Sequence, residues 1–149
     1  MGLEAVITPV HELTETQVRE MLHLMQTYYL NVTRDQFIRD MREKDVVIVL
    51  HENGVIQGFS SWVRFCHDLE GEQVNVIFSG DTIIEPSHWN SLILPLAWGR
   101  LMLSVLAEHP QELYWLLTSK GYKTYRFLPV FFREFYPSCV KETPPFEKA

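Results

Sequence analysis

The stretch VVIVLHENGVIQGFSSWVRFCHDLEGEQVNVIFSGDTII, residues 46–84, decides the fold. Its first five residues, 46–50, are apolar and mostly β-branched, which is typical of a buried strand. Asn53-Gly54 follows, and both residues tolerate positive φ, so they predict a hairpin turn. Residues 55–65 form the expected return strand, which ends in the turn HDLEGE, and residues 73–84 alternate as a third strand. The stretch therefore predicts an antiparallel meander.

The residues before the meander predict one short strand and two helices. Residues 5–10, AVITPV, form the expected first strand. Thr14 and Gln17 match a capping box, and Thr33 and Gln36 repeat it, so each threonine is expected to begin a helix. We interpret Thr33 as a helix cap rather than as part of a glycosylation sequon. Apolar residues then recur at helical spacing: Val18, Leu22, Met25 and Tyr29 in the first helix, and Phe37, Ile38 and Met41 in the second.

The residues after the meander predict a long helix, a strand and an aromatic helical segment. The long helix is marked by Leu96, Met102, Leu103 and Leu106 and is closed by Pro110. Residues 113–117 are a short apolar strand, and residues 123–135 are broadly helical with a kink or restart at Pro129. Strands on either side of the long helix should pair in parallel. We expect one α+β domain over residues 1–137, a mixed and mostly antiparallel sheet with helices on both faces, and a tail at 138–149.

Composition narrows the function classes. The 149 residues carry 13 Lys and Arg against 19 Asp and Glu, a net charge of −6, which disfavours nucleic acid as a partner. The longest apolar run is far shorter than the roughly 20 residues of a membrane span, so no membrane is expected. The N-terminus lacks the basic and apolar regions of a signal peptide, so we expect a cytoplasmic protein. The six histidines show no metal-ligand spacing, so no metal is expected.

The order and lengths of these elements resemble the GNAT superfamily of acyl-CoA N-acyltransferases. Residues 46–62 are similar to the family hairpin, with G-x-I-x-G-F leading into its second strand. The strand ending in DTIIEP, residues 81–86, is followed by a helix, and in the family this junction is the acyl-CoA site. The stretch YWLLTSKGYKTY, residues 114–125, resembles the fifth strand and fourth helix. The resemblance implies transfer of an acyl group from a CoA or carrier-protein thioester, the co-substrate, to a small-molecule amine.

The family position of the CoA pyrophosphate carries unusual residues here. The resemblance implies co-substrate contacts from Ile84, Trp89, Asn90, Ser91 and Lys120. The family loop Q/R-x-x-G-x-G/A falls on residues 89–94, where leucines replace both glycines and Pro95 follows. Side chains there crowd an approaching phosphate. Pro95 should start the helix near Leu94 or place a missing N–H within its first turns. We therefore expect CoA affinity weaker than the high-micromolar range.

The resemblance also implies catalytic residues. Asp81 is the candidate general base, the alternative being a turn acid that faces solvent, and Glu85 is a second candidate. The family tyrosine that protonates the thiolate, in the context F-Y-x-x-x-G-F, aligns with Phe132, which has no proton to give. Tyr122, after Gly121, is the best substitute acid, and Tyr125 is the other. A lapsed binding or structural module of the same fold is the alternative function.

Other features keep more than one interpretation. Cys66-His67 is interpreted as strand-end structure, since adjacent strand residues point to opposite faces. The aromatic second half is either core and subunit interface or an acyl-chain pocket. The basic cluster is either a solvated face or a contact for the CoA phosphates; it consists of Lys120, Lys123 and Arg126. The resemblance implies two further strands after the fourth helix, and residues 138–149 do not predict them. Either the sequence is a fragment of a longer protein, or a partner supplies the strands, or the fold does without them. We expect an exposed sheet edge and a homodimer or an aggregation-prone monomer.

Overall fold

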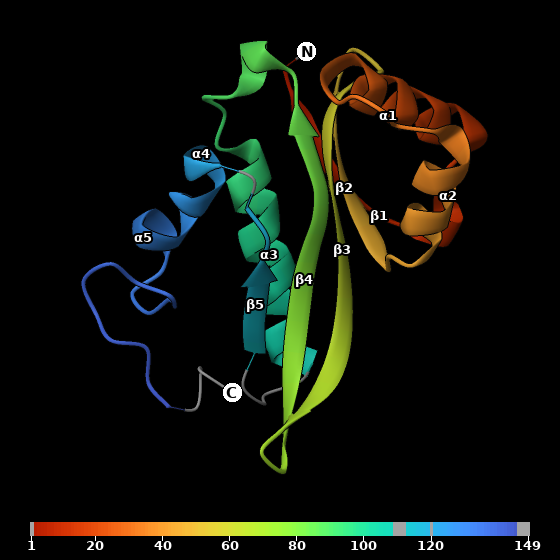
Figure 1. Ribbon diagram of the computed structural model, residues 1–149. Coiled ribbons are helices and arrows are strands. Elements are labelled where there is room, and N and C mark those ends of the chain that lie inside the picture. The colour runs from red at the N-terminus through yellow and green to blue at the C-terminus, as the bar shows by residue number, and fades with distance from the viewer. Residues whose placement is uncertain (1, 109–112, 120, 146–149) are drawn as a thin grey trace.

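The computed structural model describes residues 2–108, 113–119 and 121–145, and they form a five-stranded sheet in the order β1-β2-β3-β4-β5. The first four strands pair antiparallel, and β5 pairs parallel to β4 after the α3 crossover, as the sequence predicts (Figure 1). The strands are β1 (Glu4–Pro9), β2 (Val46–Glu52), β3 (Val55–Leu69), β4 (Glu72–Ile84) and β5 (Leu113–Leu117).

Both hairpin turns of the meander depend on residues with positive φ. Asn53 and Gly54 have φ of 52° and 81°, so the predicted turn between β2 and β3 is confirmed. The second turn is shorter than expected, because β3 runs on to Leu69 and only Glu70-Gly71, at φ 54° and 90°, connects it to β4. His67 and Asp68 are exposed and polar, so the sequence predicts them in the turn, although both belong to β3 and pair with β4.

The two N-terminal helices begin where their caps predict. In α1 (Glu15–Tyr28), the Thr14 side chain accepts from the Gln17 amide, and the Gln17 side chain accepts from the Thr14 amide at 2.9 Å. In α2 (Arg34–Arg42), the Thr33 side chain accepts from the Gln36 amide, which confirms the cap interpretation. Both helices therefore owe their start to local side-chain hydrogen bonds.

The later helices agree only in part with their sequence pattern. The long helix α3 is Ile93–Glu108, and its predicted end at Pro110 lies outside the described residues. The aromatic segment forms two short helices, α4 (Tyr122–Tyr125) and α5 (Phe127–Phe131), and no helix continues to residue 135. The break falls at Arg126 and not at Pro129. Pro129 lies in the first turn of α5, where backbone N–H groups form no hydrogen bonds within the helix, so the proline is tolerated there.

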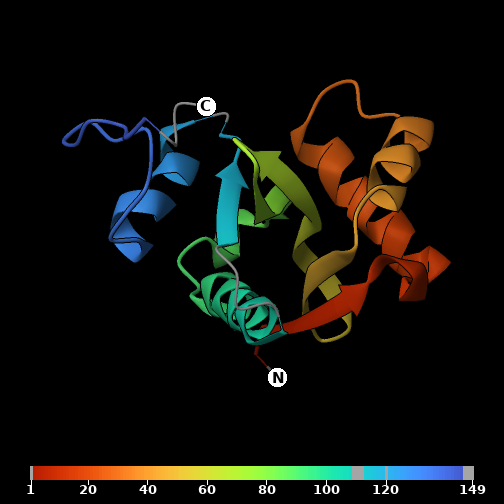
Figure 2. The ribbon, with the colours of Figure 1, turned by 90° about the horizontal axis from the view of Figure 1, so that it is seen from below.

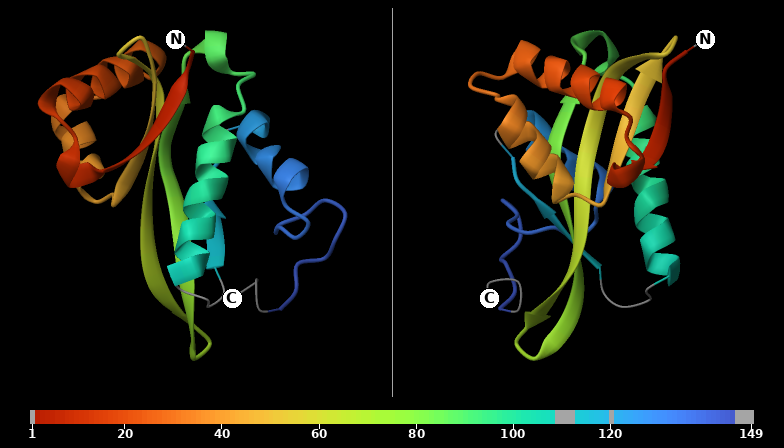
Figure 3. Two further views of the ribbon diagram at one scale, coloured as in Figure 1. Left: turned by 180° about the vertical axis from the view of Figure 1, so that it is seen from behind. Right: turned by 90° about the vertical axis from the view of Figure 1, so that its right-hand side faces the viewer.

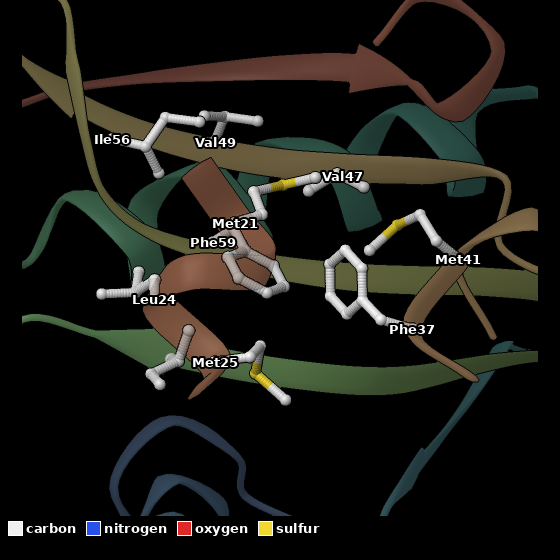
Figure 4. Close-up of a cluster of buried hydrophobic side chains, with 10 residues drawn as sticks. Met21, Leu24, Met25, Phe37, Met41, Val47, Val49, Ile56 and Phe59 are labelled. Atoms are coloured by element: carbon white, nitrogen blue, oxygen red, sulfur yellow. The ribbon is translucent and has the colours of Figure 1, made fainter. Parts of the chain in front are cut away.

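Helices cover both faces of the sheet, as expected. Figures 1 and 2 show α1 and α2 on one side and α3 on the other, with α4 and α5 beyond the β5 edge. The core beneath α1 and α2 is aliphatic and methionine-rich, and the Phe37 ring meets the Phe59 ring edge-on at 6.2 Å (Figure 4). The core beneath α3 contains Ile48, Leu50, Trp62, Ile77, Leu94, Ala97, Leu101 and Val105.

The glycine at position 58, in the family-like hairpin motif, is explained by a close approach of two strands. A Cβ at Gly58 would lie 2.8 Å from the carbonyl oxygen of Ile83 and 3.0 Å from the Cα of Ile84. These are backbone atoms of the paired strand, which cannot move away without breaking the register. Gly58 thus lets β3 approach β4 closely next to the junction that leads to α3.

Candidate active site

The parallel strands β4 and β5 stay together for only part of their length. β5 pairs with β4 from Asn75 to Ser79, whereas β4 continues to Ile84 paired with β3 alone, among the described residues (Figure 1). The Glu85 amide donates to the Gln57 carbonyl on β3 at 2.8 Å. Because the backbone groups of successive strand residues point to opposite edges, those of Ile84 and Thr82 point away from β3. This edge offers backbone hydrogen-bonding groups to an extended ligand arm.

A bulge bends β4 where the two strands diverge. Ser60 pairs with Thr82 and Trp62 with Ser79, so one residue of β3 faces Gly80 and Asp81 on β4. Asp81, the predicted base, is half-buried at this bulge. Bulges frequently re-aim a side chain beside an active site, so the geometry suits a carboxylate that meets a reacting amine.

The junction between β4 and α3 positions three of the predicted co-substrate residues. After the short 3₁₀ turn η2 (Pro86–His88), the Trp89 indole Nε1 donates to the Ile84 carbonyl oxygen at 2.8 Å. Asn90 is exposed, and Ser91 Oγ accepts from the Ile93 amide at 3.2 Å. The indole therefore occupies one of the backbone acceptors on the open edge of β4.

The start of α3 presents few amides to an anion. The Leu96 amide donates to the Leu92 carbonyl at 2.9 Å, so the N–H groups of residues 92–95 have no acceptor within the helix. Pro95 has no N–H, and the Ile93 amide already donates to Ser91 Oγ. Only two of these four positions can therefore offer an N–H group to an anion. Leu92 is 63% exposed at the mouth of this helix end. Leucines and Pro95 therefore stand where the resemblance implies a glycine-rich phosphate cradle.

A ladder of aromatic rings runs beneath the divergence. Ring centroids are 6.3 Å apart between Trp62 and Trp98, 5.6 Å between Trp98 and Trp115, and 5.3 Å between Trp115 and Phe132. Phe132, which aligns with the family tyrosine, thus packs on an indole. Because these rings pack against one another at tilted angles, core packing accounts for this part of the aromatic second half.

Serine and threonine hydroxyls line the same ladder. Trp98 Nε1 donates to Ser60 Oγ at 3.2 Å, and Ser60 Oγ lies 2.7 Å from Thr82 Oγ1. Trp115 Nε1 donates to Ser79 Oγ at 3.0 Å. These contacts tie α3 and β5 to β3 and β4 on both sides of the bulge.

The predicted acid and the basic cluster lie in the segment after β5. Tyr122 is 73% exposed, and its ring lies 5.9 Å from the Arg126 guanidinium carbon. The Tyr125 hydroxyl donates to the Pro137 carbonyl at 3.2 Å, so it ties down the C-terminal segment. Lys120 lies outside the described residues. In the described geometry, no contact joins Tyr122 to Asp81.

An open groove of about 610 Å³ lies between α1, the start of β3 and the end of β4. Its polar lining includes Glu20, His23 and Glu85. The Tyr28 hydroxyl donates to Glu85 Oε2 at 2.5 Å, and this hydrogen bond, with desolvation and the nearby charge, raises the pKa of Tyr28. The sequence singled out Glu85 but gave no signal for Tyr28, because 57 residues separate the partners.

Among the residues at 2–108, 113–119 and 121–145, no three His, Cys, Asp or Glu side chains gather as metal ligands would. None of the helices in the described part combines the length and apolarity that crossing a bilayer requires.

The whole structure is similar to solved N-acetyltransferases. The aminoglycoside N-acetyltransferase AAC(6')-Iy in complex with CoA matches with a TM-score of 0.64 at 11% identity, over 96% of this chain and 97% of that chain. A ribosomal-protein-alanine N-acetyltransferase from Brucella melitensis matches at 0.63 and 11%, over 95% and 99%. A Trypanosoma brucei acetyltransferase matches at 0.63 and 18%, over 95% and 100%.

Sequence comparison adds no relative. No protein-family profile matches the chain, and no curated protein matches it. At identities this low the structural likeness establishes the fold, which is that of the GNAT N-acyltransferases, with its mixed sheet and helices on both faces.

Proposed function

We propose that the chain is an N-acyltransferase that moves an acyl group from a CoA or carrier-protein thioester to a small-molecule amine. The observation that carries the proposal is the split between β4 and β5 with a bulge and a carboxylate beside it. It occurs in a chain whose whole length matches N-acetyltransferase structures, one of them in complex with CoA. Function follows from such a site rather than from the fold.

The chemistry assigned to this site is direct acyl transfer. Asp81 takes a proton from the ammonium form of the acceptor, and the amine nitrogen then attacks the thioester carbonyl carbon. The new C–N bond replaces the C–S bond, and the leaving thiolate takes a proton from an acid, for which Tyr122 is our candidate. The attacking nitrogen then loses its extra proton, which restores the Tyr122 phenol and leaves a neutral amide. The backbone groups of Thr82 and Ile84 on this edge, other than the Ile84 carbonyl that Trp89 occupies, hold the thioester arm extended. This positioning supplies part of the rate.

The weak phosphate cradle makes the pantetheine arm the main determinant of donor binding. Pro95 and the leucines around it argue against tight seating of a pyrophosphate at the start of α3. The fit to CoA is therefore poor at this helix end and better along the strand edge. We expect acyl-pantetheine and acyl-CoA to bind with similar, weak affinity, and Ile84, Trp89, Asn90, Ser91 and Lys120 remain our candidate contacts.

A thiol-release assay with acetyl-CoA, acetyl-pantetheine and a panel of amines tests the function. Thermal shift with the same thioesters tests binding, since a ligand at 100 times its Kd stabilises by about 2.7 kcal/mol. Asp81→Asn and Tyr122→Phe should each lower turnover by roughly 10²–10⁴-fold without unfolding the protein. Glu72→Gln, at the far end of the same strand, is the matched control and should keep full turnover.

Phe132 and Pro95 favour one alternative, a lapsed module that keeps the fold and binds without catalysis. Phe132 has no proton to donate to a thiolate. Pro95 has no backbone N–H to donate to a phosphate. If thioesters shift the melting temperature but no thiol is released with any amine, this alternative replaces our proposal. Tight CoA binding with the pyrophosphate on the amides at the start of α3 would contradict the weak-affinity prediction.

A further inference from the structure

The outward side of α3 carries an apolar seam. Leu96 and Leu103 are 60% and 67% exposed, Leu92 at the helix start is 63% exposed, and Leu106 is 41% exposed. Gly99 lies between them and is also exposed. We call these five residues the α3 seam. A helix that is apolar all round is typical of one covered on every side, whereas the described residues cover only its inner face.

The seam is uncovered in the described structure. Figure 3, left, shows α3 in front of the sheet with its outer side open, between the N-terminal helices and the α4–α5 segment. A groove of about 410 Å³ continues from α3 to β1, lined in part by Leu3, Ile7 and Leu96. β1 is an edge strand of the sheet, and Ile7 on it is 40% exposed. The exposed surface therefore continues from the helix onto the sheet edge, where Glu4 and Arg100 add charge to a partly apolar lining.

The spacing of the seam is nearly symmetric about Gly99. Leu96 lies three residues before it and Leu103 four residues after it, while Leu92 and Leu106 each lie seven residues away. A two-fold axis through Gly99, with two α3 helices running antiparallel, places each Leu96 beside the partner's Leu103. The same operation places Leu92 beside Leu106. A surface that is complementary to itself in this way is the property of an isologous interface.

Gly99 permits the close approach that such a crossing needs. An ideal Cβ at this position would meet nothing within 4 Å, so no packing among the described residues explains the absent side chain. Glycine in the middle of a helix costs roughly 0.5–1 kcal/mol relative to alanine. A residue without a side chain at the crossing point lets two helix backbones come near each other.

The charge pattern disfavours a lipid surface as the occupant. Helices that lie on membranes are rich in Lys and Arg on their polar face. Between Ile93 and Ala107 the only charged residue is Arg100, and the chain as a whole carries −6. An anionic bilayer would therefore gain little electrostatic attraction from this helix.

We propose that the α3 seam is the interface of a two-fold symmetric homodimer, in which two α3 helices cross antiparallel at Gly99. Sixteen residues of α3 span roughly 24 Å, so the helix alone offers less than the roughly 800 Å² per partner of a standard interface. The exposed edge of β1, where Ile7 is 40% exposed, extends the surface beyond the helix. This interface differs from the outer edge of β5, which pairs with no strand in the described part of the chain. It does not depend on the proposed acyltransferase activity.

Sedimentation velocity over a concentration series tests the proposal. The wild-type protein should form a reversible dimer, and Leu96→Glu/Leu103→Glu should be monomeric at concentrations where the wild type is dimeric. Leu30→Glu is the matched control, because Leu30 is 92% exposed and lies far from α3 in the sequence. It should leave the dimer intact, and circular dichroism should show both variants folded.

Disulfide trapping tests the position of the axis. Cys66 and Cys139 are exposed and are first replaced by serine. Gly99→Cys in that background should give a disulfide-linked dimer, because a two-fold axis brings the two residues within bridging distance. Ser104→Cys is the control on the same helix, five residues and about 140° away, and should remain unlinked.

Three results would overturn the proposal. One is a monomer at every concentration, and another is a dimer that the double glutamate variant leaves intact. The third is binding of the wild-type monomer to phosphatidylglycerol vesicles through the seam, which would assign the surface to lipid.

Discussion

The two faces of the sheet are stabilised by different kinds of contact. Beneath α1 and α2, the core consists of methionine, phenylalanine and aliphatic side chains around the fully buried Phe59 (Figure 4). Beneath α3, three indoles stack in a ladder, and Trp98 and Trp115 donate to serine hydroxyls. The first face gains stability from burial alone. The second adds directional polar contacts at the place where β4 and β5 diverge.

This difference separates stability from function in the molecule. Apolar packing tolerates exchange among side chains of similar volume, whereas paired polar groups demand one geometry. We therefore expect changes beneath α1 and α2 to alter the free energy of unfolding alone. Changes beneath α3 should also alter thioester binding.

The largest effect is expected at Phe59. Phe59→Ala removes a fully buried ring that contacts Phe37, and should lower the free energy of unfolding by about 3–5 kcal/mol. Urea denaturation measures it. Phe59→Leu keeps most of the volume and should lose less than about 1.5 kcal/mol. A loss below 1 kcal/mol for Phe59→Ala would mean that the burial-driven face is not the main source of stability.

The next effect concerns the close approach of β3 and β4. Gly58→Ala places a methyl group 2.8 Å from the Ile83 carbonyl oxygen, and should cost about 1–3 kcal/mol of unfolding free energy. Gly121→Ala is the control, since its φ of −173° is extended and a Cβ there would meet nothing within 4 Å. Chemical denaturation of both variants checks the prediction. Equal stability of the two would show that the strands can move apart freely.

A matched pair of substitutions sharpens the polar side of the comparison. Trp115→Phe leaves the buried Ser79 hydroxyl without its indole donor, which should cost about 1–3 kcal/mol. Trp98→Phe should cost less, because Ser60 keeps Thr82 as a partner. Thermal and urea unfolding of both variants give the difference. The reverse order would indicate that ring packing, and not hydrogen bonding, dominates this face.

The smallest effect concerns Tyr28 and Glu85 at the rim of the groove. The hydrogen bond to the Glu85 carboxylate raises the pKa of Tyr28 above its ordinary value of 10.0 in the folded state. A raised folded pKa contributes stability below pH 10, and this contribution is lost as the pH rises through the folded value. Tyr28→Phe should therefore lower Tm at pH 7 and lose that difference in alkaline solution. A difference in Tm that does not depend on pH would contradict this assignment.

Much of the fold could be predicted from local signals. The caps at Thr14 and Thr33 and the turn at Asn53-Gly54 use hydrogen bonds and φ preferences within a few residues, so the sequence carries them directly. The break in the aromatic segment was predicted in the wrong place. Pro129 excludes a helix only where an N–H is needed, and that depends on where the new helix begins.

The candidate site was only partly visible in the sequence. Asp81 could be singled out from its place beside Gly80, but the bulge that holds it exists only in the register between β3 and β4. The contacts of Trp98 with Ser60 and of Trp115 with Ser79 join residues 38 and 36 positions apart. No local pattern reports such pairs, because each partner alone is an ordinary strand or helix residue.

The sequence by itself determined the order of strands and helices, the starts of α1 and α2, the hairpin turn and the absence of a glycine cradle before α3. Only the tertiary structure decided which side of α3 is buried. Leu96, Leu103 and Leu106 mark the helix in the sequence but lie on its exposed side, whereas Leu94, Ala97, Leu101 and Val105 face the core. The physical reason is that α3 is apolar all round, so its periodicity offers no contrast between two faces. Contact with the sheet determines which side is buried, because one side of α3 packs against Ile48, Trp62 and Ile77.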